Sequence, residues 1–338
     1  MTRARKELVD INETPYYHCI CRCVRRAFLC GKDCHTGKNY EHRREWVVDR
    51  LSLLSRVFSI QICSYAIMQN HFHLVVRINE KEGLSLSDQE VARRWKKLYS
   101  WPMLVSQYLN GEGSAAETSK AQEIIQTWRE RLCDLSWYMR CLNEYLARKA
   151  NKEDNCTGRF WEGRYKSQAL LDDAAVLTCM SYVDLNPIRA GIADTPEHSD
   201  YTSIQQRINA LGRYTKTQNP SKNKSKTEKP IRLMQLTKND NNPHAIGFTA
   251  RDYLELVDWA GRVVRNNKRG AISETEPPIL DRLGLDSEVF IEHIGAPIEK
   301  QAQPKALGSF DKLKALAEHW KQKFIRSQSY SLKLYKIQ

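Results

Sequence analysis

The strongest constraint on the fold comes from two apolar segments that follow each other almost directly in the chain. Residues 57–68 (VFSIQICSYAIM) and 71–78 (HFHLVVRI) alternate as half-buried β-strands do, and only Gln69 and Asn70 separate them. A connection this short joins antiparallel neighbours, so the two segments are expected to form a β-hairpin. The fold must therefore contain an antiparallel sheet built on this hairpin.

The flanking sequence adds further elements to the hairpin. In chain order it predicts a strand over 16–24, a helix over 40–54, helices between 80 and 150, a strand over 164–170 and a helix over 173–184. Asp172 is a suitable N-cap for the last helix, and Pro187 a suitable terminator. The order β-α-β-β-α-β followed by a helix predicts an α+β fold with a ferredoxin-like antiparallel sheet.

A change in composition divides the chain near residue 214. Residues 215–245 contain six lysines among Asn, Ser, Thr and Pro, which predicts a flexible basic linker between a domain over 1–214 and a small α-helical C-terminal unit over 246–338. The two units are then expected to fold separately. The alternative is that the C-terminal segment packs on the sheet. The sequence indicates no role for this unit.

Charge and cysteine content narrow the class of protein. The chain has 53 Lys and Arg against 40 Asp and Glu, a net charge of +13, which favours a polyanionic partner such as nucleic acid or an anionic surface. No segment approaches the ~20 apolar residues of a membrane span, and the basic start leads into no apolar signal sequence. We therefore expect a cytoplasmic protein whose ten cysteines stay reduced.

His71 and His73 are the sharpest local feature. Residues two apart on a strand point to the same side, so both imidazoles leave the sheet on one face while Phe72 faces the other. Two neutral imidazoles side by side form half of a divalent-metal site. The alternative for so short a motif is a pair of packed or surface histidines.

Tyr182 and Asn186 are the second feature. They lie four residues apart on the predicted helix, so they share one of its faces. An amide oxygen at Asn186 could complete a metal site beside the phenol. A phenol with a pKa near 10 is a poor nucleophile at neutral pH and needs a polarised phosphate or a base. The alternative is a core tyrosine with a solvated hydroxyl.

A basic strand is the third feature. Arg164 and Lys166 are expected to share one strand face, and Arg159 precedes them together with Phe160 and Trp161. Cations spaced in this way beside aromatic rings suit a phosphate backbone and unstacked bases. The alternative is a solvated edge strand.

Taken together, these features resemble one family. Residues 68–76 (MQNHFHLVV) resemble the HUH signature, two histidines around a bulky apolar residue, and 158–167 (GRFWEGRYKS) and 182–191 (YVDLNPIRAG) resemble two later blocks in the same order. The family is the single-tyrosine HUH transposases, in particular the REP-associated tyrosine transposase branch, and the resemblance spans about residues 10–205. Gln69 departs from the proline that is common in this branch.

The resemblance implies a fold, a reaction and roles for residues. It implies that residues 1–214 are a catalytic domain that cleaves and rejoins single-stranded DNA near hairpins, such as REP-like palindromes, through a 5′-phosphotyrosine. Tyr182 would be the nucleophile and Mg²⁺ or Mn²⁺ the cofactor. The metal ligands would be His71, His73 and Asn186, the last being the position where HUH enzymes vary. The DNA contacts would be Arg159, Arg164 and Lys166.

Other functions are compatible with the same motifs. One is an HUH nicking endonuclease without strand transfer, and another is a non-catalytic DNA-binding regulator on the same fold. A third is a hydrolase in which Tyr182 is structural. The resemblance also leaves both a monomer and a homodimer open.

Overall fold

The computed structural model describes residues 8–24, 29–33, 37–210, 230–236, 245–264, 306–322 and 324–325. The strands are β1 (Tyr16–Arg22), β2 (Ile60–Ile67), β3 (His71–Ile78), β4 (Lys166–Leu170), β5 (Gln235–Leu236), β6 (Ala245–Ile246) and β7 (Ala306–Leu307). The helices are α1 (Arg43–Leu54), α2 (Glu80–Ser85), α3 (Asp88–Lys96), α4 (Met103–Leu109), α5 (Ala115–Cys133), α6 (Leu135–Glu153), α7 (Asp173–Asp184), α8 (Asn186–Arg189), the 3₁₀ helix η2 (Pro196–His198), α9 (Ser203–Ala210), α10 (Ala250–Val264) and α13 (Phe310–His319).

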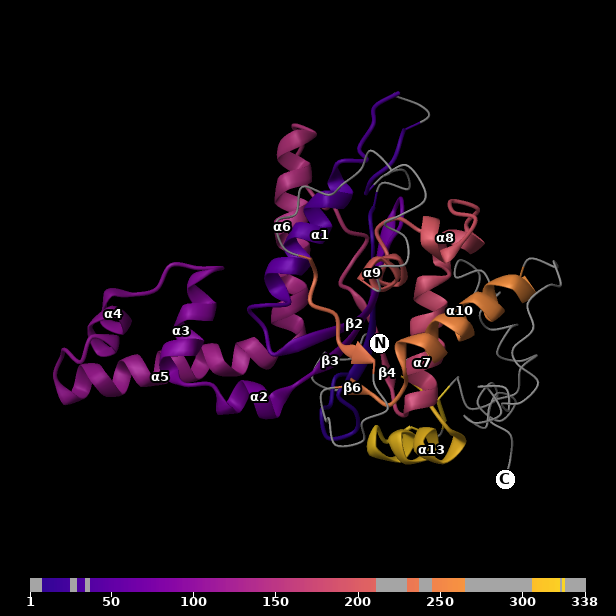
Figure 1. The fold of residues 1–338 in the computed structure, drawn as a ribbon. Helices are drawn as coiled ribbons and strands as arrows, with labels where there is room; N and C mark the ends of the chain where they lie inside the picture. The colour runs from indigo at the N-terminus through magenta and orange to yellow at the C-terminus, as the bar shows by residue number, and fades with distance from the viewer. Residues whose placement is uncertain are drawn as a thin grey trace.

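A five-stranded sheet forms the centre of the molecule, in the order β2-β3-β1-β4-β7 (Figure 1). The expected hairpin is confirmed, since β2 and β3 pair antiparallel. β1 lies between β3 and β4 and pairs antiparallel with both, while β7 adds to β4 in the parallel sense. The prediction of a mixed fold of helices around a mainly antiparallel sheet is thus confirmed.

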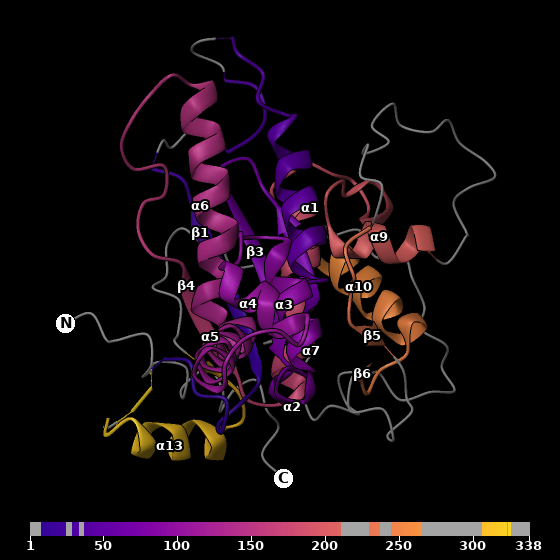
Figure 2. The same cartoon turned by 90° about the vertical axis from the view of Figure 1, so that its left-hand side faces the viewer.

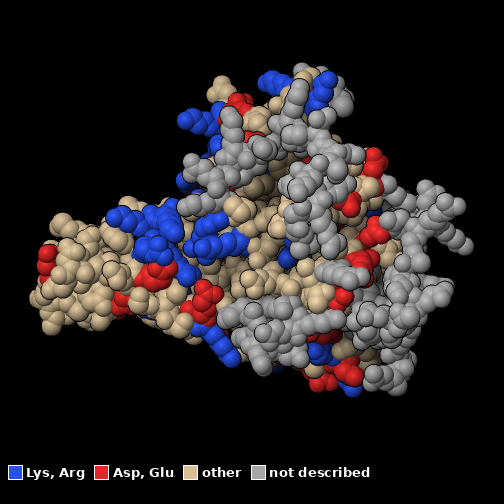
Figure 3. Space-filling model, in the orientation of Figure 1, with Lys and Arg blue, Asp and Glu red and all other residues tan. Residues whose placement is uncertain are grey.

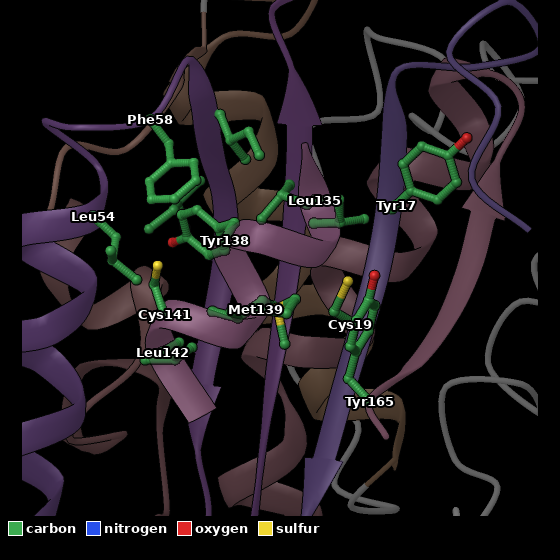
Figure 4. Close-up of a cluster of buried hydrophobic side chains, with 14 of the residues drawn as sticks. Tyr17, Cys19, Leu54, Phe58, Leu135, Tyr138, Met139, Cys141, Leu142 and Tyr165 are labelled. Atoms are coloured by element: carbon green, nitrogen blue, oxygen red, sulfur yellow. The ribbon is translucent and has the colours of Figure 1, made fainter. Parts of the chain in front are cut away.

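The pleat of β1 and β3 gives the sheet two different faces. Tyr17, Cys19 and Phe72 point to the face that α1 and α6 cover, and they belong to the larger core. Figure 4 shows this core, in which Tyr138 of α6 lies edge-on to Phe58 with ring centroids 5.3 Å apart. α1 and α6 are on one side of the strands and α7 is on the other (Figure 1).

α7 covers the second face of the sheet. Asp172 accepts a hydrogen bond from the Ala175 amide and so caps the helix, as expected. Every α7 residue after Asp173 is buried, because the sheet lies on one side of the helix and α10 packs on another. Tyr253 and Val257 of α10 belong to the same core as the α7 side chains.

Helices α3, α4 and α5 project from the sheet beside α6 (Figures 1 and 2). α5 begins at Ala115, where Ser114 and Glu117 form a capping box. α5 and α6 have 19 residues each, and no helix in the described part of the chain is long and apolar enough to cross a membrane.

The C-terminal segment contributes to the same sheet and cores. β7 pairs with β4, and Leu313 and Leu316 of α13 are buried in the larger core. Within the predicted linker, Ile231 and Met234 are buried, and the Met234 amide donates to the Ile62 carbonyl of β2. The rest of that linker lies outside the described residues. The division at residues 214 and 245 stays a prediction, and these contacts favour packing on the sheet.

Candidate active site

His71 and His73 lie on the α7 face of β3. In the sheet register His71 is opposite Arg22 and His73 is opposite Ile20, both on β1. Their ring centroids are 4.8 Å apart, and Phe72 points into the core on the other face. The structure therefore brings the two imidazoles together as the spacing predicts.

Hydrogen bonds to neighbouring side chains fix the tautomers of both histidines. Gln168 Oε1 can only accept, so His18 Nδ1 carries the proton at 3.3 Å, and His18 Nε2 then accepts from His73 Nδ1 at 2.9 Å. In the same way, Asn70 Oδ1 accepts from His71 Nδ1 at 2.6 Å. Each Nε2 atom is therefore left with a free lone pair.

Both imidazoles are neutral in this environment. Burial, followed by the nearby charge of Arg22, lowers the pKa of His71 to about 4. Burial, followed by the neighbouring His71 and His18 rings, lowers the pKa of His73 well below its usual value. His71 Nε2 and His73 Nε2 are buried, and neither has a hydrogen-bond partner among the described residues. Two such atoms side by side lack the partner that buried polar groups normally have.

Tyr182 reaches this pair from α7. Its ring centroid is 5.9 Å from that of His73 and 6.2 Å from that of His18, in edge-on contacts. The side chain is 7% exposed, and burial is the main reason why its pKa is raised above the usual value. The phenol is therefore neutral at rest, in contact with the His73 ring.

Arg189 of α8 covers the other side of the phenol. Its guanidinium carbon lies 4.6 Å from the centroid of the Tyr182 ring, and its charge lowers the pKa of that phenol against the effect of burial. Burial lowers the pKa of Arg189 to about 10. Its Nε and Nη2 are buried without a hydrogen-bond partner in the described residues. A buried guanidinium with two open donor positions is suited to a phosphate oxygen.

Asn186 lies on the same side of the helix as Tyr182. Its Nδ2 donates to the Tyr182 backbone carbonyl at 3.2 Å, and its side chain also favours the ionised phenol. With the amide nitrogen held in this way, the oxygen is the atom left for other contacts. Asn186 as third ligand stays a prediction.

The three predicted DNA-binding cations are all exposed, but they do not form one strand face. β4 begins at Lys166, so Arg164 precedes the strand and the expected alternation with Lys166 is wrong. Lys166 is opposite Ile20 of β1 and shares the α7 face with His73. Arg159 lies in the segment between α6 and β4. A DNA contact by any of them stays a prediction.

His18, Gln168 and Arg189 were not identified from the sequence. The alternation that places Cys19 and Cys21 on one face of β1 also places His18 on the other, which is the face of His73. Arg189 follows Tyr182 by seven residues, about two helical turns, and so belongs to the same face. For His18 and Arg189 the signal was present in the spacing, but a single His or Arg forms no recognisable motif.

The donor set fits a divalent metal. In the part of the chain that the structure describes, no group of three or more His, Cys, Asp or Glu side chains is arranged to hold a metal ion. The predicted set is of another kind, two imidazoles and one amide. The two partnerless Nε2 atoms are of the imidazole type that binds divalent transition metals, whereas Mg²⁺ prefers oxygen ligands such as the Asn186 amide.

Comparisons with known proteins add little to this geometry. No family model and no curated protein matches the chain. One similar solved structure is described as the structure of the REP-associated tyrosine transposase bound to a REP hairpin. The identity is 11%, the TM-score is 0.37, and the match covers 65% of this chain and 93% of that one. At these values the similarity supports no conclusion about activity.

Proposed function

We propose that this chain is a metal-dependent transposase that cleaves and rejoins single-stranded DNA near hairpins through a 5′-phosphotyrosine. One observation carries the proposal: the Tyr182 ring lies against His73, and the Nε2 atoms of His73 and of the adjacent His71 are buried with no hydrogen-bond partner in the described residues. A packed structural histidine pair would satisfy those atoms with hydrogen bonds.

The arrangement of the sheet supports the same proposal. Read from one side, the strand order β4-β1-β3-β2, with α7 following β4, favours a ferredoxin-like β-α-β-β-α-β unit. This connectivity places the end of α7 over β3, so that Tyr182 and His73 meet although 108 residues separate them in the chain.

His71 and His73 would hold the metal, together with the amide oxygen of Asn186. When bound, Mg²⁺ or Mn²⁺ would polarise the scissile phosphate as a Lewis acid. The described residues contribute the rest. The Gln168–His18–His73 chain holds the His73 ring in the tautomer that presents Nε2, as partners behind metal ligands do in other sites.

The reaction at Tyr182 is a transesterification. The phenolic oxygen forms a bond to phosphorus, the bond from phosphorus to the 3′-oxygen breaks, and the phenol's proton ends on that oxygen as a 3′-hydroxyl. A second 3′-hydroxyl reverses the step, joining two strands and restoring the phenol. Arg189 would stabilise the developing phenolate or bind a phosphate oxygen, since its guanidinium lies over the Tyr182 ring and its Nε and Nη2 have no partner in the described residues.

The test is a cleavage assay on the full chain. Labelled single-stranded hairpin DNA is incubated with Mg²⁺ or Mn²⁺, and covalent adducts are resolved on a denaturing gel. We expect an adduct with the wild type, none with Tyr182→Phe, and none in the presence of EDTA. Tyr253→Phe is a matched control, because that buried phenol also lies in the α7 core.

The products distinguish the competing functions. A phosphotyrosine adduct followed by strand joining supports a transposase, and an adduct without joining indicates a nicking endonuclease. DNA binding without any adduct leaves a non-catalytic regulator. Cleavage that persists in Tyr182→Phe would mean that Tyr182 is structural.

A further inference from the structure

A second recess lies on the opposite side of the sheet from Tyr182. It is a cleft of about 990 Å³ between the projecting α3 and α5 on one side and α1 and α6 on the other. Figure 1 shows the projection meeting α6 at an angle, on the side away from α7. The cleft therefore shares no residue with the candidate active site.

Aromatic rings line the base and the rim of the cleft. Trp95 and Trp128 stack almost parallel at its base, with centroids 5.4 Å apart and an angle of 8° between the rings. Tyr99 continues from Trp95 at 4.9 Å and is 37% exposed, while Trp137 lies 6.0 Å away and is partly exposed. Flat ring surfaces are thus available beside a rigid aromatic base.

Cations surround these rings. The Arg131 guanidinium lies 4.3 Å from the centroid of Trp137 and that of Arg140 lies 4.9 Å from it. Of the lining residues in the described chain, Glu144 is the only acid, against the basic side chains Arg50, Arg131, Arg140, Arg148, Lys149 and Lys152. Figure 3 shows Lys and Arg side chains gathered where the projection meets the rest of the molecule.

We propose that this cleft binds a single-stranded nucleic acid, independently of the chemistry at Tyr182. Unpaired bases expose flat faces that stack on aromatic side chains, and their phosphates attract cations arranged alongside. A duplex hides those faces, so the rings at Tyr99 and Trp137 would have no use for it. An acidic peptide would use the cations but not the rings.

The first test measures charge. Full-length Tyr182→Phe protein is titrated with a fluorescent oligothymidylate of about 12 nucleotides at several salt concentrations. Replacing Arg140 and Arg148 by Gln removes two cations whose side chains are 60% and 79% exposed. We expect affinity to fall at least fivefold and the slope of log K against log salt to flatten by about 1.4.

A matched variant controls for net charge. Lys120→Gln with Lys314→Gln removes the same two charges from exposed positions on α5 and α13, neither of which lines the cleft. This variant should bind almost as the parent does. Equal losses in both variants would overturn the proposal, because the binding would then depend on overall charge.

The second test measures stacking. Trp137→Leu and, separately, Tyr99→Leu keep an apolar side chain but remove the ring, and each should weaken binding about tenfold, within the range known for one stacked base. Folding is checked by the melting temperature. Light-induced cross-linking of a 5-iodouracil oligonucleotide, followed by peptide mapping, should place the contact at Tyr99, Trp137 or Tyr145.

Three probes define the ligand. Oligouridylate replaces oligothymidylate to compare RNA with DNA, and either one binding at the cleft supports the proposal. A blunt duplex and an oligoglutamate peptide of equal charge are the opposing probes. If the peptide competes as well as the oligonucleotide, or if cross-links map only to β3 and α7, the proposal fails. Tyr182→Phe keeps this result separate from any failure of the cleavage reaction.

Discussion

The two faces of the sheet differ in how far their side chains are exposed to solvent and in how many charges they carry. On the α7 face, His73 and Tyr182 are buried, and the guanidinium of Arg189 lies over the phenol ring. On the α1–α6 side, the cleft exposes aromatic rings and basic side chains with Glu144 as the single lining acid in the described residues. Buried neutral groups suit bond making, because interactions there are not weakened by water. Exposed cations suit capture of a long polyanion.

This difference predicts that chemistry and strand binding can be impaired separately. A variant on the α7 face should lower the cleavage rate at saturating DNA and leave binding at the cleft unchanged. A variant in the cleft should weaken binding and leave the rate at saturation unchanged.

Truncation after residue 214 should have the largest effect. It removes Tyr253, Leu256 and Val257, all buried against α7, and β7 beside β4. At roughly 1.5–3 kcal/mol for each buried side chain, the loss approaches the whole stability of a typical domain. We expect the fragment 1–214 to show no cooperative melting transition in calorimetry or in near-ultraviolet circular dichroism, because the α7 face has lost its packing partners.

The control for truncation is a chain ending at residue 325, which keeps every described element. It should melt as the full chain does. If the fragment 1–214 instead melts cooperatively and cleaves DNA, the C-terminal segment is a separate unit, as the composition of residues 215–245 suggests.

His73→Ala should have the next largest effect. It removes one of two ligand nitrogens, so metal-dependent adduct formation should fall at least a hundredfold, since even groups behind ligands contribute 10- to 100-fold. Val75→Ala is the matched control, because Val75 is buried on the same face of the same strand. Val75→Ala should lose stability but keep its adduct. Equal adduct levels in both variants would contradict the metal site.

The sequence predicted the site to the extent that it lay within local motifs. Strand alternation puts His71 and His73 on one face, and helical spacing puts Tyr182 on the same side as Asn186. The helix α7 begins at Asp173, as the Asp172 cap predicts. His18 and Arg189 come from separate elements, and only pairing in three dimensions shows that they matter. The position of Arg164 was wrong because β4 starts two residues later than alternation suggests. Features set by local spacing could be predicted, and contacts between separate elements could not.

The same limit applies to the cleft and to the C-terminal segment. Trp95, Trp128 and Trp137 lie on three helices, and no spacing in the sequence indicates that their rings meet. β7 has two residues, too few to show alternation, and it forms a strand only because β4 offers an unpaired edge.

Asp184→Asn should change how the stability of the folded protein depends on pH, through a buried carboxyl on the α7 face. Asp184 accepts hydrogen bonds from Ser203 and Tyr253, and burial raises the pKa of its carboxyl from 3.8 to about 6. Between these values the unfolded chain has lost the proton and the folded protein has kept it, so this group's contribution to stability falls as pH rises to about 6 and is constant above. The stability difference between wild type and Asp184→Asn should change by about 2–3 kcal/mol over that window.

Chemical denaturation at several pH values measures this difference, and other titrating groups cancel in the comparison. A constant difference from pH 4 to pH 7 would show that Asp184 is ionised throughout. Oligonucleotide binding at the cleft should be the same in both proteins, because Asp184 joins α7 to α9 and α10 and does not line the cleft.

Gln168→Leu should have a smaller effect on the same face. It removes the acceptor that fixes the His18 proton, so the His73 ring is no longer held in the tautomer that presents Nε2. We expect the metal concentration for half-maximal cleavage to rise about tenfold while the rate at saturating metal changes little. Gln61→Leu is the control, since Gln61 accepts a hydrogen bond from Arg77 on β3 and is not part of the Gln168–His18–His73 chain. A fall in the saturated rate alone would assign Gln168 another role.

Glu144→Gln should have the smallest effect, and it acts on the cleft in the opposite direction. Glu144 pairs with Arg140 at 3.4 Å and also with Arg148, so its carboxylate competes with phosphates for both guanidiniums. Exposed ion pairs of this kind contribute at most about 1 kcal/mol, so removing the charge should raise oligothymidylate affinity about two- to fivefold. Glu123→Gln removes a carboxylate that is paired with Lys120 on α5 and lies outside the cleft, so its affinity should stay near that of the parent. The cleavage rate at saturating DNA should be unchanged in both variants, because the sheet separates α6, which carries Glu144, from α7, which carries Tyr182 (Figure 1). If Glu144→Gln weakens binding, the carboxylate is holding the arginines in the geometry that the strand needs, and the cleft is preorganised by its one acid rather than opposed by it.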